Sequence, residues 1–210
     1  MKPNILTTTV MLLACSLFIF GYFSFKSSLA TNAIESRIDH FLRQGSPSLS
    51  KSDESLAHME SSLFVFSAHQ LNSFILFNQW RSYLNQVDNP NPDWFTLLGT
   101  SAHIRPTWSN TYVELAKLTS SLQEELAYQQ LALLFGPYSL SSRLLLIDST
   151  FSRWEEIAVE QRVDASQHLI SIANSWRHRP KLNSMITLSE GSQRICNLLV
   201  FNEIKVKACG

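Results

Sequence analysis

One block, Pro106–Pro137, constrains the fold of this chain more than any other stretch, because it has a proline at each outer edge. Tyr112 and Ala116 stand at helical spacing in its first half, and a second helical stretch restarts at Ser121. Proline is poorly tolerated inside a helix, so the two edge prolines bound a helical unit. The block therefore predicts two antiparallel helices joined by a short turn.

A helix pair of this size is the unit of tetratricopeptide-like arrays, whose repeats run to roughly 34 residues. Apolar residues at helical spacing continue on both sides of the block, but the pairs differ in length. We therefore expect an all-α fold, with an N-terminal transmembrane helix followed by an irregular tetratricopeptide-like helical-hairpin domain. The expected organisation is a membrane anchor over 1–26, a juxtamembrane helix and linker over 27–50, and a helical domain over 51–210.

The N-terminal stretch Ile5–Phe25 carries no charge and is long enough, at about 20 residues, to cross a bilayer as a helix. A single-pass anchor is favoured because a cleaved signal peptide has a shorter apolar region. Cleavage stays open as an alternative, since Ser28-Leu29-Ala30 offers small residues to a peptidase. A lipoprotein cysteine at Cys15 is the weakest alternative, because the residues after it stay mostly apolar.

Cysteine usage bears on the compartment. Cys15 lies in the apolar segment, which leaves Cys196 and Cys209 near the C-terminus. Two cysteines in a domain outside the cytoplasm tend to pair, and a loop of this length would stabilise the fold by roughly 3 kcal/mol. The alternative is two unpaired thiols in a cytosolic tail. We expect the disulfide, which would place residues 27–210 in the periplasm of a bacterium.

The formal net charge is zero, which argues against nucleic acid as a partner. The strongest local charge is the basic run that contains Arg177, Arg179 and Lys181. It is a candidate contact for an anionic glycan, a lipid phosphate or an acidic partner. The alternative is a solvated loop between helices whose cations complete a helix C-terminus.

A second candidate partner-binding surface lies at the start of the proline-bounded block, at Arg105, Trp108 and Tyr112. Arg105 directly precedes a proline, so it is held extended and outside the helix. It would pair with an acid of the neighbouring helix or line a groove. We expect Trp108 to pack between the two helices of the hairpin.

No catalytic motif is present in the sequence, and no two histidines stand at metal-binding spacing on one helix face. The acidic residues are dispersed, apart from Glu124-Glu125 and Glu155-Glu156, which are typical of solvated helix starts. We therefore expect no enzymatic activity, no metal and no cofactor.

Around Arg105-Pro106-Thr107-Trp108, Tyr112 and Gly136-Pro137, the chain resembles the VpsP-like polysaccharide-biosynthesis proteins of Gram-negative bacteria. The turn Asn91-Pro92-Asp93 and Trp154 also match, and the resemblance is dense over 86–155. It departs at Ser109-Asn110, at Tyr138, where the family has tryptophan, and at Thr119-Ser120-Ser121, where the family has an acidic turn. The resemblance implies a single-pass inner-membrane protein with a periplasmic tetratricopeptide-like domain that works with exopolysaccharide polymerisation and export proteins.

Three functions follow as expectations. The first is a membrane-anchored periplasmic adaptor that assists the assembly or export of a cell-surface polysaccharide by protein contact. The second is a structural subunit of another envelope complex, such as the secretion or division machinery. The third, a glycan-active enzyme, is disfavoured because no pair of catalytic acids is evident in the sequence.

Overall fold

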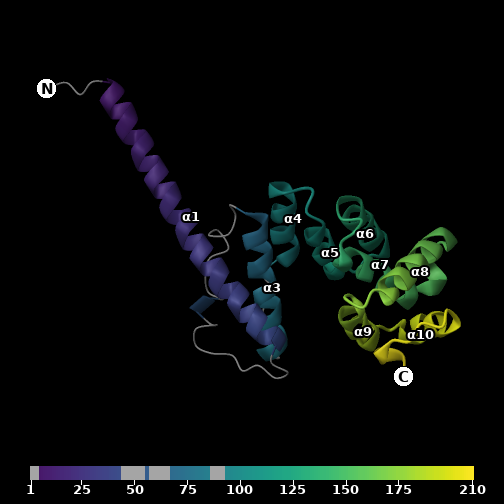
Figure 1. Cartoon of the computed structure of the whole chain (residues 1–210). Coiled ribbons are helices and arrows are strands. Elements are labelled where there is room, and N and C mark those ends of the chain that lie inside the picture. Colours follow the sequence, from purple (N-terminus) through teal and green to yellow (C-terminus); the bar gives the residue numbers. More distant parts are fainter. Residues whose placement is uncertain (1–4, 44–54, 57–66, 86–92) are drawn as a thin grey trace. The chain divides into compact units, whose positions relative to one another are not determined.

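The computed structural model describes residues 5–43, 55–56, 67–85 and 93–210 of the 210-residue chain. Over these ranges every regular element is a helix and none is a strand, which confirms the predicted all-α class. The chain divides into two compact units, Met1–Pro106 and Thr107–Gly210, which are described separately (Figure 1). This division falls inside the range 51–210 that we expected to form one domain.

The first unit begins with α1 (Ile5–Arg43), a helix of 39 residues that runs without a break (Figure 1). From Thr8 to Lys26 every side chain is exposed, and this part is long and apolar enough to cross a membrane. From Ser27 onward burial is confined to one face, at Ala30, Ile34 and Phe41 among others. The spacing of three or four residues is that of a helix packed along one stripe.

The buried stripe of α1 packs against α3 (Ala68–Asn85), which places Leu71, Phe74, Ile75 and Phe77 in the core of the first unit. The rings of Phe41 and Phe77 stack with their centroids 6.2 Å apart. The contact begins as soon as the exposed part of α1 ends, since the hydroxyl of Ser27 donates to Oε1 of Gln70 at 2.9 Å. The apolar segment therefore continues directly into a folded helix pair.

The third helix of this unit, α4 (Trp94–Ile104), packs on α3 and begins at a capping residue, Asp93. The Asp93 carboxylate accepts hydrogen bonds from the hydroxyl and the backbone N–H of Thr96, and these bonds hold the pKa of Asp93 below its usual value. Asp93 has the carboxylate that an N-cap needs.

The second unit is a succession of antiparallel helix pairs (Figure 1). Within it α5 contacts α7 and α7 contacts α9, so the first helices of successive pairs pack in series. The elements are α5 (Ser109–Leu118), α6 (Leu122–Phe135), α7 (Leu140–Ser152), η2 (Trp154–Glu156), α8 (Val159–Asn174), α9 (Arg179–Leu188), α10 (Ser192–Phe201) and η3 (Lys207–Cys209).

The predicted hairpin is confirmed as the pair α5 and α6, whose helices make the densest packing in the unit. The ring of Tyr112 on α5 stacks on Phe135 at the end of α6, with centroids 5.6 Å apart. The two outer ends approach closely at Gly136, where an added Cβ would lie 2.5 Å from Oγ of Ser109. A Cβ at this position would therefore force the Ser109 side chain to move, whereas the φ of −142° at Gly136 is one that any residue adopts.

The core of the second unit lies between α7, α8, α9 and α10 and includes Leu146, Phe151, Leu169 and Ile195. The loop between α9 and α10 presses against the end of α7 at Gly191. A Cβ at Gly191 would lie 2.5 Å from the backbone carbon of Phe151, which has no freedom to move aside. This contact fixes the α9–α10 loop against α7.

The C-terminal tail is closed onto this core by a disulfide. Cys196 on α10 is bonded to Cys209 in η3, with an S–S distance of 2.02 Å and the two Cα atoms 5.4 Å apart. The predicted pairing is confirmed, and Cys15 is exposed and unpaired. Both bonded residues pack against the apolar core.

Candidate functional site

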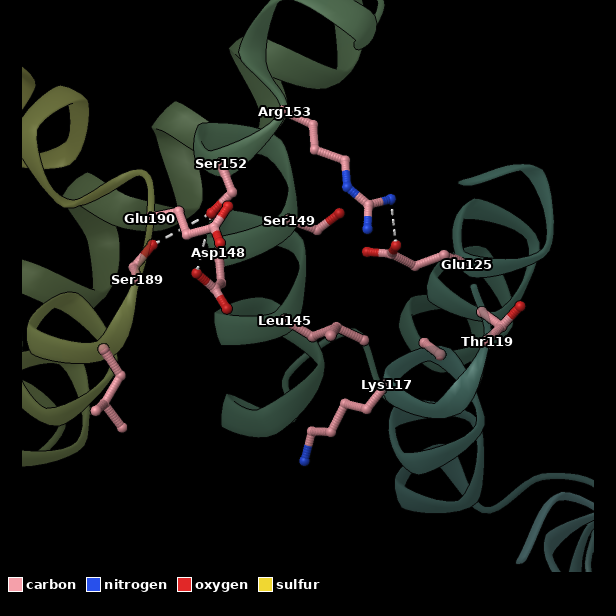
Figure 2. Close-up of a pocket in the computed structure, with 12 residues that line it drawn as sticks. Lys117, Thr119, Glu125, Leu145, Asp148, Ser149, Ser152, Arg153, Ser189 and Glu190 are labelled. Carbon is pink, nitrogen blue, oxygen red and sulfur yellow. Dashed lines mark hydrogen bonds and ion pairs between the residues drawn. The ribbon is translucent and has the colours of Figure 1, made fainter. Parts of the chain in front are cut away.

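A pocket of about 380 Å³ opens in the second unit along one face of α7 (Figure 2). That face consists of Leu145, Asp148, Ser149 and Ser152, which lie on one side of a helix by their spacing. On one side the pocket is bounded by the pair α5 and α6, and on the other by the end of α9. We call this pocket the α7 groove; its other lining residues are Ala116, Lys117, Thr119, Glu125, Arg153, Leu188, Ser189 and Glu190.

An ion pair closes one end of the α7 groove. Nη1 of Arg153, which follows α7, lies 2.5 Å from Oε2 of Glu125 on α6 (Figure 2). The Glu125 side chain is only 10% exposed and that of Arg153 is 37% exposed. We expected Glu125 to be a solvated residue of a helix start, and this was wrong. α7 covers its face of α6, and Arg153 supplies the positive charge that a buried carboxylate needs.

The ion pair extends into a chain of buried and half-buried polar side chains. Gln129, which is 1% exposed, donates from Nε2 to Oε1 of Glu125 at 3.3 Å. Nε2 of Gln161 on α8 donates in turn to Oε1 of Gln129 at 3.5 Å. The network joins three helices, and its hydrogen bonds offset the cost of burying these groups.

At the opposite wall, hydroxyl groups fasten the α9–α10 loop to α7 (Figure 2). Oγ of Ser152 lies 3.4 Å from Oγ of Ser189 and 3.5 Å from Oδ1 of Asp148. The backbone N–H of Gly191 donates to both serine hydroxyls, at 3.2 and 3.1 Å. This wall is therefore held by polar contacts in addition to the close packing at Gly191.

Two carboxylates of the α7 groove have no cation beside them. Among the residues that the structure describes, Asp148 and Glu190 form no ion pair, whereas Lys117 lies 2.7 Å from Glu114. Glu190 is exposed and Asp148 is half-buried. The positive charges that line the groove are thus already matched, and two negative charges are not.

The floor of the α7 groove contains an unsatisfied hydroxyl. Ser149 is 8% exposed, and its Oγ has no hydrogen-bond partner among the residues that the structure describes. Its side chain extends toward the side of the groove that carries Glu125 and Arg153 (Figure 2). A buried polar group without a partner costs about 1–3 kcal/mol. Ser142 and Thr150 on the same helix also bury unpartnered hydroxyls, but neither lines the groove.

The candidate residues at the start of the hairpin differ in their exposure and belong to different units. Arg105 is exposed and caps the C-terminus of α4 in the first unit. Trp108 is half-buried and stands just before α5 in the second unit. Tyr112 is 8% exposed, and this burial raises the pKa of its phenol. Its ring belongs to the core of the hairpin, so it presents little surface to a partner.

The basic run at the start of α9 has a structural component. Nε of Arg179 donates to the carbonyl of Ala173 at 2.8 Å, in the last turn of α8. This is the helix-completing role that we gave as the alternative for the run. Arg177 and Lys181 are exposed. Arg179 is therefore accounted for by the fold, and the other two remain surface cations.

The α7 groove itself was missed by the sequence reasoning. Leu140, Leu144 and Ile147 form the apolar stripe of α7 and pack in or against the core, whereas the opposite stripe lines the groove. The available signal was a second face of small and acidic residues on a helix with helices packed around it. The described residues include no group of three or more His, Cys, Asp or Glu side chains placed to hold a metal ion. The groove can offer hydrogen bonds and negative charge to a bound group.

Comparison with known proteins found no matching family model, no matching curated sequence and no matching solved structure. The resemblance to the VpsP-like proteins therefore stays a prediction.

Proposed function

We propose that this protein is a non-enzymatic, membrane-anchored adaptor that assists the assembly or export of a cell-surface polysaccharide by binding a partner protein. The observation that carries the adaptor role is the α7 groove, an open polar face between helix pairs that pack in series. Stacked helix pairs with an open face are typical of tetratricopeptide-like proteins, which commonly serve protein binding, and this likeness supports the proposed adaptor role. The polysaccharide part of the proposal is supported by the sequence resemblance alone.

The proposed location is the inner membrane of a bacterium, with the bulk of the chain in the periplasm. The apolar half of α1 supports a single-pass anchor, because it is exposed on all sides and long enough to cross a bilayer. The bond between Cys196 and Cys209 supports an oxidising compartment, because cytosolic disulfides are rare.

The location is tested by labelling the thiols of the cell-extracted protein, denatured without a reducing agent. Labelling at Cys15 only is expected. Labelling at Cys196 and Cys209 as well would remove the main physical support for the periplasm.

The function is tested by deleting the gene and measuring the amount and chain length of surface polysaccharide. A decrease in either, restored by the full chain but not by a chain lacking residues 107–210, is expected. Unchanged polymer in the deletion strain would refute the polysaccharide role. Purification from mild detergent then identifies the bound proteins. If these belong to secretion or division machinery, the chain is instead a structural subunit of that complex.

A further inference from the structure

We propose that the α7 groove binds a basic segment of the partner protein, with a lysine or arginine side chain entering the pocket. This inference rests on the adaptor role proposed above and specifies the chemistry of the partner. The proposal is carried by the balance of charge in the groove and by the unpartnered hydroxyl on its floor.

The charge balance favours a cation. Glu125 is neutralised by Arg153, and Lys117 is paired with Glu114. Asp148 and Glu190 remain as two carboxylates at one pocket, with no ion pair to any described residue. Opposite charges attract over the short distances of a pocket, so an ammonium or guanidinium group is the complementary ligand.

The hydroxyl of Ser149 gives an independent reason for a polar ligand, because a hydroxyl can accept a hydrogen bond as well as donate one. It is buried, lines the groove and has no hydrogen-bond partner in the described part of the chain. A lysine ammonium carries three donors, an arginine guanidinium five, and each backbone amide one. A basic peptide lying along α7 would offer donors to the Ser149 oxygen and a positive charge to Asp148 and Glu190.

The apolar part of the lining suits the stem of such a side chain. Leu145 is half-buried on the floor, and Leu188 is 87% exposed at the end of α9. Lysine and arginine lay their methylene groups along apolar surface while the charged end stays among polar groups. Leu145 and Leu188 are the apolar surface available for this contact in the groove.

Other ligands fit less well. A phosphate or an anionic glycan would be repelled by the two unmatched carboxylates. A neutral sugar ring would find no stacking surface, since none of the described residues that line the groove is aromatic. A bound metal ion lacks a cluster of three ligating side chains in the described parts of the chain.

The probe is an acetylated and amidated peptide of alternating alanine and lysine that carries a fluorophore. Its affinity for the full chain in a neutral detergent is measured by fluorescence anisotropy at low and at physiological salt. Peptides with glutamine or glutamate in place of lysine are compared. The lysine peptide is expected to bind most tightly and to weaken as salt screens the charges.

The variants localise the binding. Asp148→Asn is expected to weaken the lysine peptide about fivefold, the loss of one partly exposed charge pair, with Glu190→Gln acting in the same direction. Ser149→Ala is expected to weaken it by a smaller factor. Glu160→Gln removes an exposed carboxylate of α8 outside the groove and is the matched control, expected to leave the affinity unchanged. Circular dichroism confirms that each variant is folded.

Equal affinity for the lysine and glutamine peptides would overturn the proposal. So would an equal loss in Asp148→Asn and Glu160→Gln, because that indicates attraction by overall charge. Binding of a neutral oligosaccharide that Asp148→Asn abolishes would assign the groove to a glycan instead. If the peptide fails to bind but deletion of the gene still reduces surface polysaccharide, the adaptor role stands and the basic partner does not.

Discussion

The ion pair between Glu125 and Arg153 makes a prediction that depends on which partner is buried. The carboxylate is 10% exposed and the guanidinium is 37% exposed, although the two are in direct contact at 2.5 Å. Removing Arg153, the more exposed partner, leaves the more buried charge of Glu125 without a counter-charge. We therefore expect Arg153→Met to destabilise the protein more than Glu125→Gln does.

The magnitudes follow from the exposures. Breaking a fully buried pair costs about 3–5 kcal/mol, and an exposed pair contributes only about 0.2–1 kcal/mol. Arg153→Met leaves Glu125 with Gln129 as its remaining described donor, so we expect a loss of about 2–3 kcal/mol, below the fully buried limit. Glu125→Gln leaves a guanidinium that water still reaches, so we expect about 1–1.5 kcal/mol. The double variant is expected to lose less than the sum, with a coupling of about 1 kcal/mol or more.

The assay is urea-induced unfolding of the full chain in a neutral detergent, followed by far-ultraviolet circular dichroism. The original protein, the two single variants and the double variant form a double-mutant cycle. If their unfolding curves have the same slope against urea concentration, a shift in the midpoint measures the change in stability. The control is Glu124→Gln, because the neighbouring exposed carboxylate only accepts a hydrogen bond from Thr119. It is expected to change stability by less than about 0.5 kcal/mol.

Two results would refute this reasoning. A larger loss in Glu125→Gln than in Arg153→Met would mean that burial does not set the cost. A coupling near zero would mean that the pair is a solvated contact.

Three further predictions follow from the packing and the capping. Hydrogen bonds from Thr96 lower the pKa of Asp93 in the folded protein. The stabilisation from this N-cap is therefore fully present above 3.8, the pKa of the unfolded chain, and is lost as the pH falls through the lower pKa of the folded protein. The protection factor of the Thr96 amide, which is its exchange rate corrected for the intrinsic effect of pH, should fall in that pH range. Asp93→Asn, which caps without titrating, should abolish that pH dependence. Gly191→Ala should destabilise the protein by about 1–3 kcal/mol, because its Cβ would overlap the backbone of α7. Gly99→Ala, inside α4 with open space around it, should stabilise the protein by about 0.5–1 kcal/mol. Thermal unfolding measures both effects, and an unchanged melting temperature for Gly191→Ala would contradict the close packing. Thr150→Val removes a buried unpartnered hydroxyl and should be neutral or stabilising by up to about 1 kcal/mol, so a clear loss in urea unfolding would show that the hydroxyl has a partner.

The elements that the sequence predicted well are those set by local chemistry. The hairpin of α5 and α6 was predictable because prolines, a glycine and helical spacing all act within a few residues. The disulfide was predictable because the sequence offers one pair of cysteines outside the apolar segment. The apolar half of α1 was predictable from its length and lack of charge.

The features that were missed depend on contacts between distant residues. Glu125 resembles any acid in a first helical turn until α7 covers it and Arg153 reaches it across 28 positions of sequence. Tyr112 resembles a surface aromatic residue until Phe135 stacks on it. The α7 groove exists only because three helix pairs pack in series, which no local pattern encodes.

The helix α1 passes from its fully exposed half into the packed half between Lys26 and Ser27 with no joint (Figure 1). A straight helix rises about 1.5 Å per residue, so the pairing of α1 with α3 starts within one turn of the apolar segment. With that segment in a bilayer, α1 connects the membrane to the first unit as one continuous helix. A change in bilayer thickness tilts or displaces a transmembrane helix. Because α3 packs on α1, it would move together with α1.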